Sequence, residues 1–394
     1  DCTESTLPAY TGTATASDPD GSSPEVSYTD ITVAGPCPES YIINRTWLTT
    51  DGCTNTAFCL QVINVDEIAP QIENCAVTRN VEGCSTAAIT GPNFSTTSAA
   101  SSIAVFEDAT NQGSISTVCG TGTVTYIDAA TGTCPTVVTR TWSVTDLCGN
   151  TVSCVQTINV DDTASPSIAT CPVARTVEGC NTTAITGPTY STTTTASTEA
   201  VFENGTNQGS TSDGCGISGV TYIDVATGTC PTVVTRKWTV SDDCGNTSTC
   251  NQTITLDDTV LPTVTTCAVT RNIEGCSTGA ITGPVYSATT ATSSESVFEN
   301  ATNLGSISDA CGISAVTYID VATGACPTVV TRTWTISDAC GNVSTCAQTI
   351  NVDDNVVPTV TTCAATRNIS GCGTSAITGP NYSATLAVSS EAVF

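Results

Sequence analysis

The chain of 394 residues carries 36 Asp and Glu against nine Lys and Arg, a formal net charge of −27, and it contains 24 cysteines but no His or Met. So strong a negative charge repels phosphates, which excludes nucleic acid and anionic membrane surfaces as partners. No apolar run reaches the roughly 20 residues that span a bilayer, so we expect no membrane insertion in this stretch. The cysteines predict disulfides and an oxidising compartment, and therefore an extracellular or cell-surface location.

The cysteines recur with a period of 96 residues, as in Cys75, Cys171, Cys267 and Cys363. Such a period indicates a tandem array and not one large domain. The first unit lacks its front and the last lacks its back, so we expect a fragment of a longer array. The expected units are a partial repeat at 1–66, complete repeats at 67–162, 163–258 and 259–354, and a partial repeat at 355–394.

Within the repeat at 259–354, TVTTCAVTRNI predicts a first strand, and EGCSTGAITGPVYS predicts a turn followed by a second. After a long polar segment, the runs ISAVTYIDV, PTVVTRTWTISD and VSTCAQTINVDD predict three more strands, separated by the turn signals ATGAC and ACGN. Thr, Ser, Val, Ile, Gly and Asn dominate, which is typical of β-sheet. We predict an all-β fold of tandem immunoglobulin-like β-sandwich repeats, each of about seven strands, forming an extended disulfide-stapled rod.

Alternation within the middle run predicts which side chains face the core. Val330, Arg332 and Trp334 share one parity, and threonines occupy the other. A guanidinium on the core side requires a carboxylate, and Asp320 is the candidate partner. The predicted core anchors are Trp47, Trp142, Trp238 and Trp334, and the residues predicted to pin the polar segment to the sandwich are Phe106, Phe202, Phe298 and Phe394.

Strand order places the cysteines at the two ends of each sandwich, its N-terminal and C-terminal poles. The predicted pairs are Cys276 with Cys326 at the C-terminal pole, Cys311 with Cys340 at the N-terminal pole, and Cys267 with Cys346 between the first and last strands. Each bond would add about 2–4 kcal/mol of stability, mostly by restricting the unfolded chain. The other cysteines assigned to disulfides are Cys2, Cys37, Cys75, Cys84, Cys119, Cys134, Cys148, Cys154, Cys171, Cys180, Cys215, Cys230, Cys244 and Cys250.

The first unit does not fully fit this pairing. It lacks the counterpart of Cys311, so Cys53 is left single. Either Cys53 pairs with Cys59 there, or complete repeats pair Cys340 with Cys346 and Cys267 with Cys311. Both possibilities remain open from the sequence.

An acidic doublet closes each complete repeat, and the next repeat brings further oxygen donors to the same joint. Such a cluster suits calcium, a hard cation that takes six to eight oxygen ligands. Alternatively, Asp and Asn form turns here, and the doublets keep an exposed rod soluble. The candidate ligands are Asp161, Asp162, Asp213, Asp242 and Asn246 at one joint and Asp257, Asp258, Asp309, Asp338 and Asn342 at the next.

The segments TCAVTRNIEGC, SDACG and GACPTVVTRTWTISDACGNVSTCAQTINVDD, followed by a proline, resemble the HYR-like, immunoglobulin-like repeats of giant Bacteroidetes surface adhesins of the SprB type. The resemblance covers every unit. It implies export by the type 9 system and a part in adhesion and gliding motility. It also implies O-glycosylation at Thr163 and Thr259, which lie in Asp-Thr-aliphatic triplets. Unlike the family, the complete repeats insert about 17 residues between their second and third cysteines.

Enzyme function is not expected, because His is absent, no Ser or Cys has a base at a suitable spacing, and no phosphate-binding loop follows a strand. We expect a structural stalk of a secreted adhesin, whose ligand, an extracellular surface or polysaccharide, binds regions outside this stretch. Neighbouring units of the same chain are the other expected partners. The alternative is that each repeat binds ligand through its insert, which carries Tyr286, Glu295 and Glu299.

Overall fold

The computed structural model describes residues 5–38, 40–66, 68–116, 121–378 and 380–388. The chain forms two compact units, Asp1–Asp257 and Asp258–Phe394. Its regular structure is almost entirely β-strand, which confirms the predicted all-β class.

The strands recur with the same order and nearly the same lengths in each complete repeat. The first partial repeat contains α1 (Pro8–Thr11), β1 (Glu25–Ala34), β2 (Tyr41–Thr50) and β3 (Thr56–Val65). Residues 68–162 contain β4 (Gln71–Asn74), β5 (Arg79–Glu82), η1 (Thr86–Ala88), β6 (Ala99–Ser101), α2 (Ile103–Phe106), β7 (Ser114–Ser116), β8 (Thr121–Thr131), β9 (Thr136–Asp146) and β10 (Thr151–Asp161).

The later repeats follow the same plan. Residues 163–258 contain β11 (Ser167–Thr170), β12 (Arg175–Glu178), η2 (Thr182–Ala184), β13 (Thr195–Ser197), α3 (Glu199–Glu203), β14 (Ser210–Ser212), β15 (Gly219–Thr227), β16 (Thr232–Ser241) and β17 (Thr247–Asp257). Residues 259–354 contain β18 (Thr263–Thr266), β19 (Arg271–Glu274), η3 (Thr278–Ala280), β20 (Ala291–Ser293), α4 (Glu295–Phe298), β21 (Ser306–Ser308), β22 (Ile313–Thr323), β23 (Thr328–Asp338) and β24 (Val343–Asp353). The described part of 355–394 contains η4 (Thr374–Ala376).

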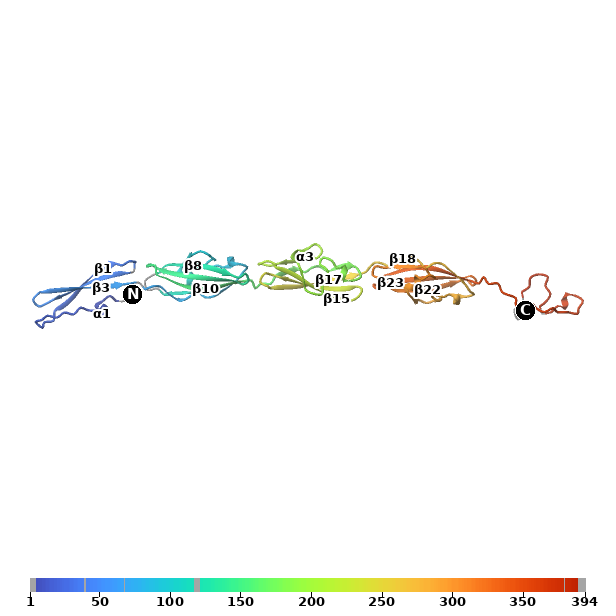
Figure 1. Cartoon of the computed structure of the whole chain (residues 1–394), viewed down its shortest axis with the longest axis horizontal. Coiled ribbons are helices and arrows are strands. Elements are labelled where there is room, and N and C mark those ends of the chain that lie inside the picture. The colour runs from blue at the N-terminus through green and yellow to red at the C-terminus, as the bar shows by residue number, and fades with distance from the viewer. Residues whose placement is uncertain (1–4, 39, 67, 117–120, 379, 389–394) are drawn as a thin grey trace. The chain divides into compact units, whose positions relative to one another are not determined.

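Each complete repeat is a sandwich of a five-stranded and a two-stranded sheet. In the repeat at 163–258, the larger sheet has the order β12-β17-β16-β15-β13, and β11 pairs with β14 in the smaller one. The three long strands β15, β16 and β17 are antiparallel neighbours, whereas β12 runs parallel to β17. Figure 1 labels β15 and β17 in this repeat. In the repeat at 259–354, the counterparts β22, β23 and β24 correspond to the three runs predicted from the sequence.

The predicted first strand is interrupted in the structure. Residues 263–273 were expected to form one strand, but the chain forms β18, leaves the small sheet and enters the large sheet as β19. The break is physically required, because β18 bonds to β21 and β19 bonds to β24, in different layers. Cys267 lies at this crossing.

The core of each repeat is built around one tryptophan. Trp238 is completely buried, with Phe202 edge-on at 5.4 Å and Tyr222 tilted at 5.4 Å between ring centroids. The indole Nε1 of Trp238 donates to Gln252 Oε1 at 3.1 Å. The predicted role of the tryptophans as core anchors is confirmed, as is that of Phe106, Phe202 and Phe298, whereas Phe394 lies outside the described residues.

The insert is therefore part of the sandwich. Its strand β13 extends the large sheet by pairing with β15, and β14 provides the partner of β11. The short helix α3 between them is capped by the Thr198 hydroxyl, which accepts from Val201 N at 3.2 Å, and it buries Phe202. Gly209 lies against this ring, so that a Cβ there would stand 2.5 Å from it.

The buried arginine has the partner that the sequence predicts. Arg332 donates to both carboxylate oxygens of Asp320, each at 2.7 Å, and both side chains are fully buried. The guanidinium carbon lies 4.3 Å from the centroid of the Tyr318 ring and 5.7 Å from that of Trp334. A bidentate, stacked and buried pair of this kind fixes the strand register but adds little net stability over an apolar pair.

Candidate functional site

One disulfide in each complete repeat closes the sandwich, and we call it the clamp. Cys171, just beyond β11, is bonded to Cys250 in β17, with 5.9 Å between their Cα atoms. Cys250 is the register partner of Trp238, so the clamp ties the small sheet to the strand that covers the core. The bonds Cys75–Cys154 and Cys267–Cys346 are equivalent. All three are pairs that the sequence predicted, and they exclude the alternative of Cys267 with Cys311.

Two further disulfides join one repeat to the next. The long staple links Cys84 to Cys215 across 131 residues, and the short staple links Cys134 to Cys244 across 110 residues. Both span the connection near Thr163. The joint between these two repeats is therefore held by the backbone and by two covalent bonds beside it.

These staples show that the predicted pairing within a pole is wrong. Cys84 does not pair with Cys134, nor Cys215 with Cys244. In the last complete repeat, Cys276 and Cys326 are both free and exposed, which overturns that predicted pair directly. The poles were assigned correctly, but Cys84 and Cys134 each bond to the facing pole of the next repeat and not to each other. The corresponding residues Cys180, Cys230, Cys311 and Cys340 are also disulfide-bonded.

The first partial repeat follows the staple rule where it is described. Cys37 is bonded to Cys148 of the following repeat, across 111 residues, which replaces the predicted bond between Cys119 and Cys148. Cys53 and Cys59 are free and exposed, so the alternative pairing of these two is also wrong. Cys2 and Cys119 lie outside the described residues.

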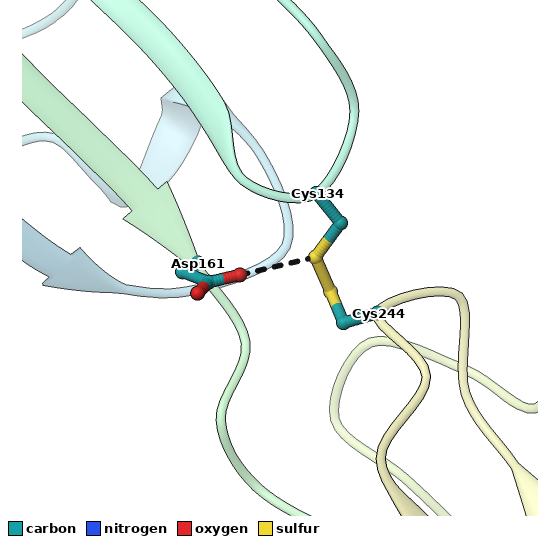
Figure 2. A group of neighbouring side chains, drawn as sticks. All are labelled: Cys134, Asp161 and Cys244. Carbon is teal, nitrogen blue, oxygen red and sulfur yellow. Dashed lines mark hydrogen bonds between the residues drawn. A yellow bond between two sulfur atoms is a disulfide. The ribbon is translucent and has the colours of Figure 1, made fainter.

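A carboxylate lies against the short staple. Asp161, at the end of β10, places its Oδ1 3.3 Å from the sulfur of Cys134 (Figure 2). Asp257 stands in the same relation to Cys230, with 3.9 Å between oxygen and sulfur. A thiolate that attacks the disulfide must therefore approach a negative charge, which opposes thiol exchange.

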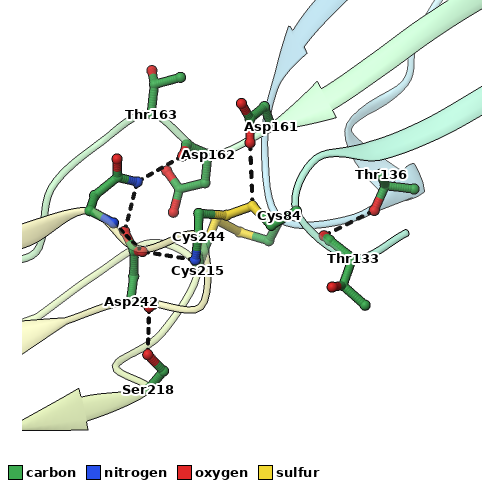
Figure 3. The surroundings of a disulfide bond; sticks show 12 residues. Cys84, Thr133, Thr136, Asp161, Asp162, Thr163, Cys215, Ser218, Asp242 and Cys244 are labelled. Atoms are coloured by element: carbon green, nitrogen blue, oxygen red, sulfur yellow. Dashed lines mark hydrogen bonds between the residues drawn. A yellow bond between two sulfur atoms is a disulfide. The ribbon is translucent and has the colours of Figure 1, made fainter. Parts of the chain in front are cut away.

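The second member of the doublet belongs to the long staple. Asp162 lies with Asp213 and Cys215 in one group, in which a carboxylate oxygen from each aspartate and the Cys215 sulfur are all within 4.8 Å of one another. Figure 3 shows Asp162 and Cys215 in the surroundings of the staples. The residues predicted as one five-ligand set thus divide between two places, because Asp161 and Asp162 face different disulfides. Cys215 Sγ is in a disulfide and cannot act as a thiolate ligand.

The two remaining members of the predicted set form a turn. Asp242 Oδ1 accepts from Cys244 N at 2.8 Å and Asn246 N at 2.9 Å, and its Oδ2 accepts from Asn246 Nδ2 at 2.9 Å. These bonds keep the pKa of Asp242 below its usual value although burial acts in the opposite direction. The turn holds Cys244 in position for the short staple.

Hydrogen bonds that the sequence did not predict complete the joint. Asn246 Nδ2 donates to the backbone carbonyl of Asp162 at 2.8 Å, and the Ser248 hydroxyl donates to that of Pro166 at 2.5 Å. In the second unit, Asn342 and Ser344 make the same bonds to Asp258 and Pro262, at 2.7 and 2.5 Å. Side chains of the turn therefore fix the chain that enters each repeat.

The threonines predicted to carry glycans are both exposed. Thr163 N and Oγ1 donate to the two carboxylate oxygens of Glu82, at 2.9 and 2.8 Å. A glycan on Thr163 would replace the hydroxyl hydrogen and so remove the hydrogen bond from Oγ1 to Glu82. Among the described residues, no helix is long and apolar enough to cross a membrane.

Comparison with known proteins finds tandem extracellular sandwiches among solved structures. The four extracellular cadherin domains of protocadherin gamma B7 match with 10% identity and a TM-score of 0.25, covering 84% of this chain and 92% of theirs. Drosophila N-cadherin EC1-4 matches with 10% identity, a TM-score of 0.23 and coverages of 82% and 85%. Sidekick-1 immunoglobulin domains 1-5 match with 8% identity, a TM-score of 0.25 and coverages of 84% and 74%. Scores this low carry no argument about function.

No family model matches the chain, and no curated protein matches it.

Proposed function

We propose that the chain is a segment of the stalk of a large secreted cell-surface adhesin. The observation that carries this proposal is the pair of staples between successive repeats. A flexible string of domains needs only its backbone, whereas cross-linking through Cys84–Cys215 and Cys134–Cys244 restricts bending and twisting at the joint. A stalk that transmits force from a distant binding region to the cell requires such stiffness.

The location and family of the stalk belong to the same proposal. Disulfides at this density form outside the cytoplasm, which supports an extracellular surface. The HYR-like motifs support an SprB-type adhesin that is exported by the type 9 system and takes part in gliding. Calcium at the joints and O-glycosylation of Thr163 and Thr259 complete the proposal, and the ligand is an extracellular surface or polysaccharide bound elsewhere in the protein.

The stalk should be elongated, because the long strands of 11 residues extend each repeat by about 36 Å. A compact globule of 394 residues would have a radius of gyration of about 21 Å. We expect small-angle X-ray scattering of the oxidised chain to give at least about twice this value. A measured radius equal to that of the compact globule would contradict a stalk.

Adhesion itself is tested by attaching the chain to a surface by one end and presenting polysaccharide-coated and bare beads. A stalk retains beads only when a known binding domain is fused to its free end. The alternative, ligand binding by the inserts, predicts retention without that domain, because every complete repeat carries one. Removing the side chain of exposed Leu304 in the insert, together with its counterparts Gln112 and Gln208, should then reduce retention.

A further inference from the structure

A buried carboxylate oxygen at the stapled joint lacks a partner. Asp162 is only 4% exposed; its Oδ1 accepts from Ala164 N at 3.1 Å, but its Oδ2 has no hydrogen-bond partner among the described residues. Buried carboxylate oxygens are almost always bonded, because removing a charge from water without compensation is costly. The Asp162 Oδ2 therefore indicates a ligand that supplies the missing interaction.

The groups around Asp162 are themselves acidic. A carboxylate oxygen of Asp213 lies within 4.8 Å, the Glu82 carboxyl is adjacent, and Asp242 is close enough for its charge to act on Asp162. Burial, the Glu82 carboxyl and the charges of Asp213 and Asp242 raise the pKa of Asp162, against the hydrogen bond from Ala164 N. The four ion pairs of the described residues all join Arg to Asp within a repeat, and none includes this cluster.

The same arrangement recurs in the second unit. Asp258, which is 4% exposed, lies with Asp309 and Cys311 in an equivalent group. The Oδ2 of Asp309 is buried there and makes no hydrogen bond to the described residues. A carboxylate oxygen without a hydrogen bond to the described residues thus occurs in both copies, at Asp162 in the first and at Asp309 in the second.

We propose that Asp162 with Asp213, and Asp258 with Asp309, each hold a hard divalent cation, for which calcium is the extracellular candidate. The oxygens that converge are carboxylate oxygens, the ligands that calcium prefers, and the neighbouring sulfur is unavailable because it is in a disulfide. Asp162 follows the last strand of one repeat and Asp213 precedes the long strands of the next, so a shared cation would join the two repeats beside the long staple. Asp161 and Asp257 are excluded from the ligand set, since each faces the sulfur of another cysteine.

This inference deepens the calcium part of the proposed function and does not depend on an adhesive role. Extracellular calcium modules bind with dissociation constants of about 10⁻⁴ to 10⁻³ M. The full oxidised chain, freed of metal with chelator, should therefore be titrated with calcium chloride by calorimetry. We expect saturable binding in this range.

Three double substitutions assign the site. Asp162→Asn with Asp258→Asn should abolish the saturable binding, whereas Asp161→Asn with Asp257→Asn removes the same charge one residue away and should leave it unchanged. Asp213→Asn with Asp309→Asn changes half-buried residues and should also abolish it, which guards against misfolding of the first variant.

Equal calcium binding in all three variants would overturn the proposal and leave the cluster as charge alone. The absence of saturable binding up to about 10 mM calcium, well above the expected range, would overturn it as well. Non-reducing peptide mapping of the same samples separates this failure from failure of the stalk. Intact staples without calcium binding would refute the cation site alone.

Discussion

When an array that lacks one clamp is stretched mechanically, the length of chain that is released depends directly on which cysteines are joined. In the wild type, force passes from the Cys75–Cys154 clamp to the Cys171–Cys250 clamp through the segment between Cys154 and Cys171. Even fully extended, this segment spans no more than about 60 Å. In the oxidised wild type, no unfolding step of this segment should therefore exceed about 60 Å.

Substitution of the clamp cysteines, Cys171→Ser with Cys250→Ser, makes the staples carry the force. One covalent route to Cys267 then runs back along the chain from Cys154 to Cys134, crosses the short staple, and continues forward from Cys244. Its full extension is no more than about 150 Å. Without staples, the whole segment from Cys154 to Cys267 would extend to about 390 Å.

Single-molecule force spectroscopy on the oxidised variant distinguishes these lengths. We expect a contour-length gain below about 150 Å in this variant, and a gain approaching about 390 Å when the staple cysteines are replaced by Ser as well. The longer step in the variant that keeps its staples would refute the reasoning, because it requires that neither staple bears load.

Three further predictions concern single residues. Arg236→Ala should lower the free energy of unfolding by about 3–5 kcal/mol, since it leaves the buried Asp224 carboxylate unpaired, whereas Lys237→Ala on the exposed face should change it by less than about 0.5 kcal/mol; equal effects in chemical denaturation would contradict the buried pair. Burial opposes ionisation of Asp146, but hydrogen bonds from Asn150 and from the backbone of Cys148 and Gly149 lower its pKa. The ionised Asp146 therefore stabilises the fold above its usual pKa near 3.8, and this contribution is lost as the pH falls through the lowered pKa. Hydrogen exchange in this turn should accelerate in that acid range, and Asp146→Asn should remove the dependence. Asp161→Asn should speed reduction of the short staple by an anionic thiol more than by a cationic one, and identical acceleration by both would exclude an electrostatic shield.

Local features of the fold could be predicted from the sequence. The three long runs and the turn signals between them predicted β22, β23 and β24, and the parity of Arg332 predicted its bond to Asp320. These features depend on neighbouring residues and adjacent strands. The crossing of the chain between sheets at Cys267 was not predicted, because it depends on which strand each half pairs with.

The cysteine pairing could not be decided from a periodic sequence. A bond from Cys84 to Cys119 or Cys134 and a bond from Cys84 to Cys215 use cysteines that recur in every complete repeat, so the pattern does not separate bonds within a repeat from bonds between repeats. The first repeat did contain a signal. It keeps Cys37 and Cys53 but lacks the third cysteine of a complete repeat, the counterpart of Cys311, so Cys53 has no partner within its pole. This agrees with bonds between repeats, such as that from Cys37 to Cys148.

The division of the acidic doublet could have been anticipated. Successive side chains of an extended chain point in opposite directions, so Asp161, the last residue of β10, and Asp162 directly after it were poor candidates for ligands of one cation. Both carboxylate oxygens of Asp242 accept hydrogen bonds within its turn, as expected of a turn-forming residue. The close approach of Asp162 and Asp213 could not be predicted from the sequence, because it depends on how two repeats pack against each other.

Cleavage of the backbone at the joint is the most direct test of the stapled array. A protease site introduced into the exposed residues 163–165 lies between the two cysteines of each staple. After cleavage of the full oxidised chain, we expect one species on a non-reducing gel and two fragments after reduction. A matched chain with Cys84, Cys134, Cys215 and Cys244 replaced by Ser should separate without reductant. Separation of the unsubstituted cleaved chain without reductant would contradict the covalent joint.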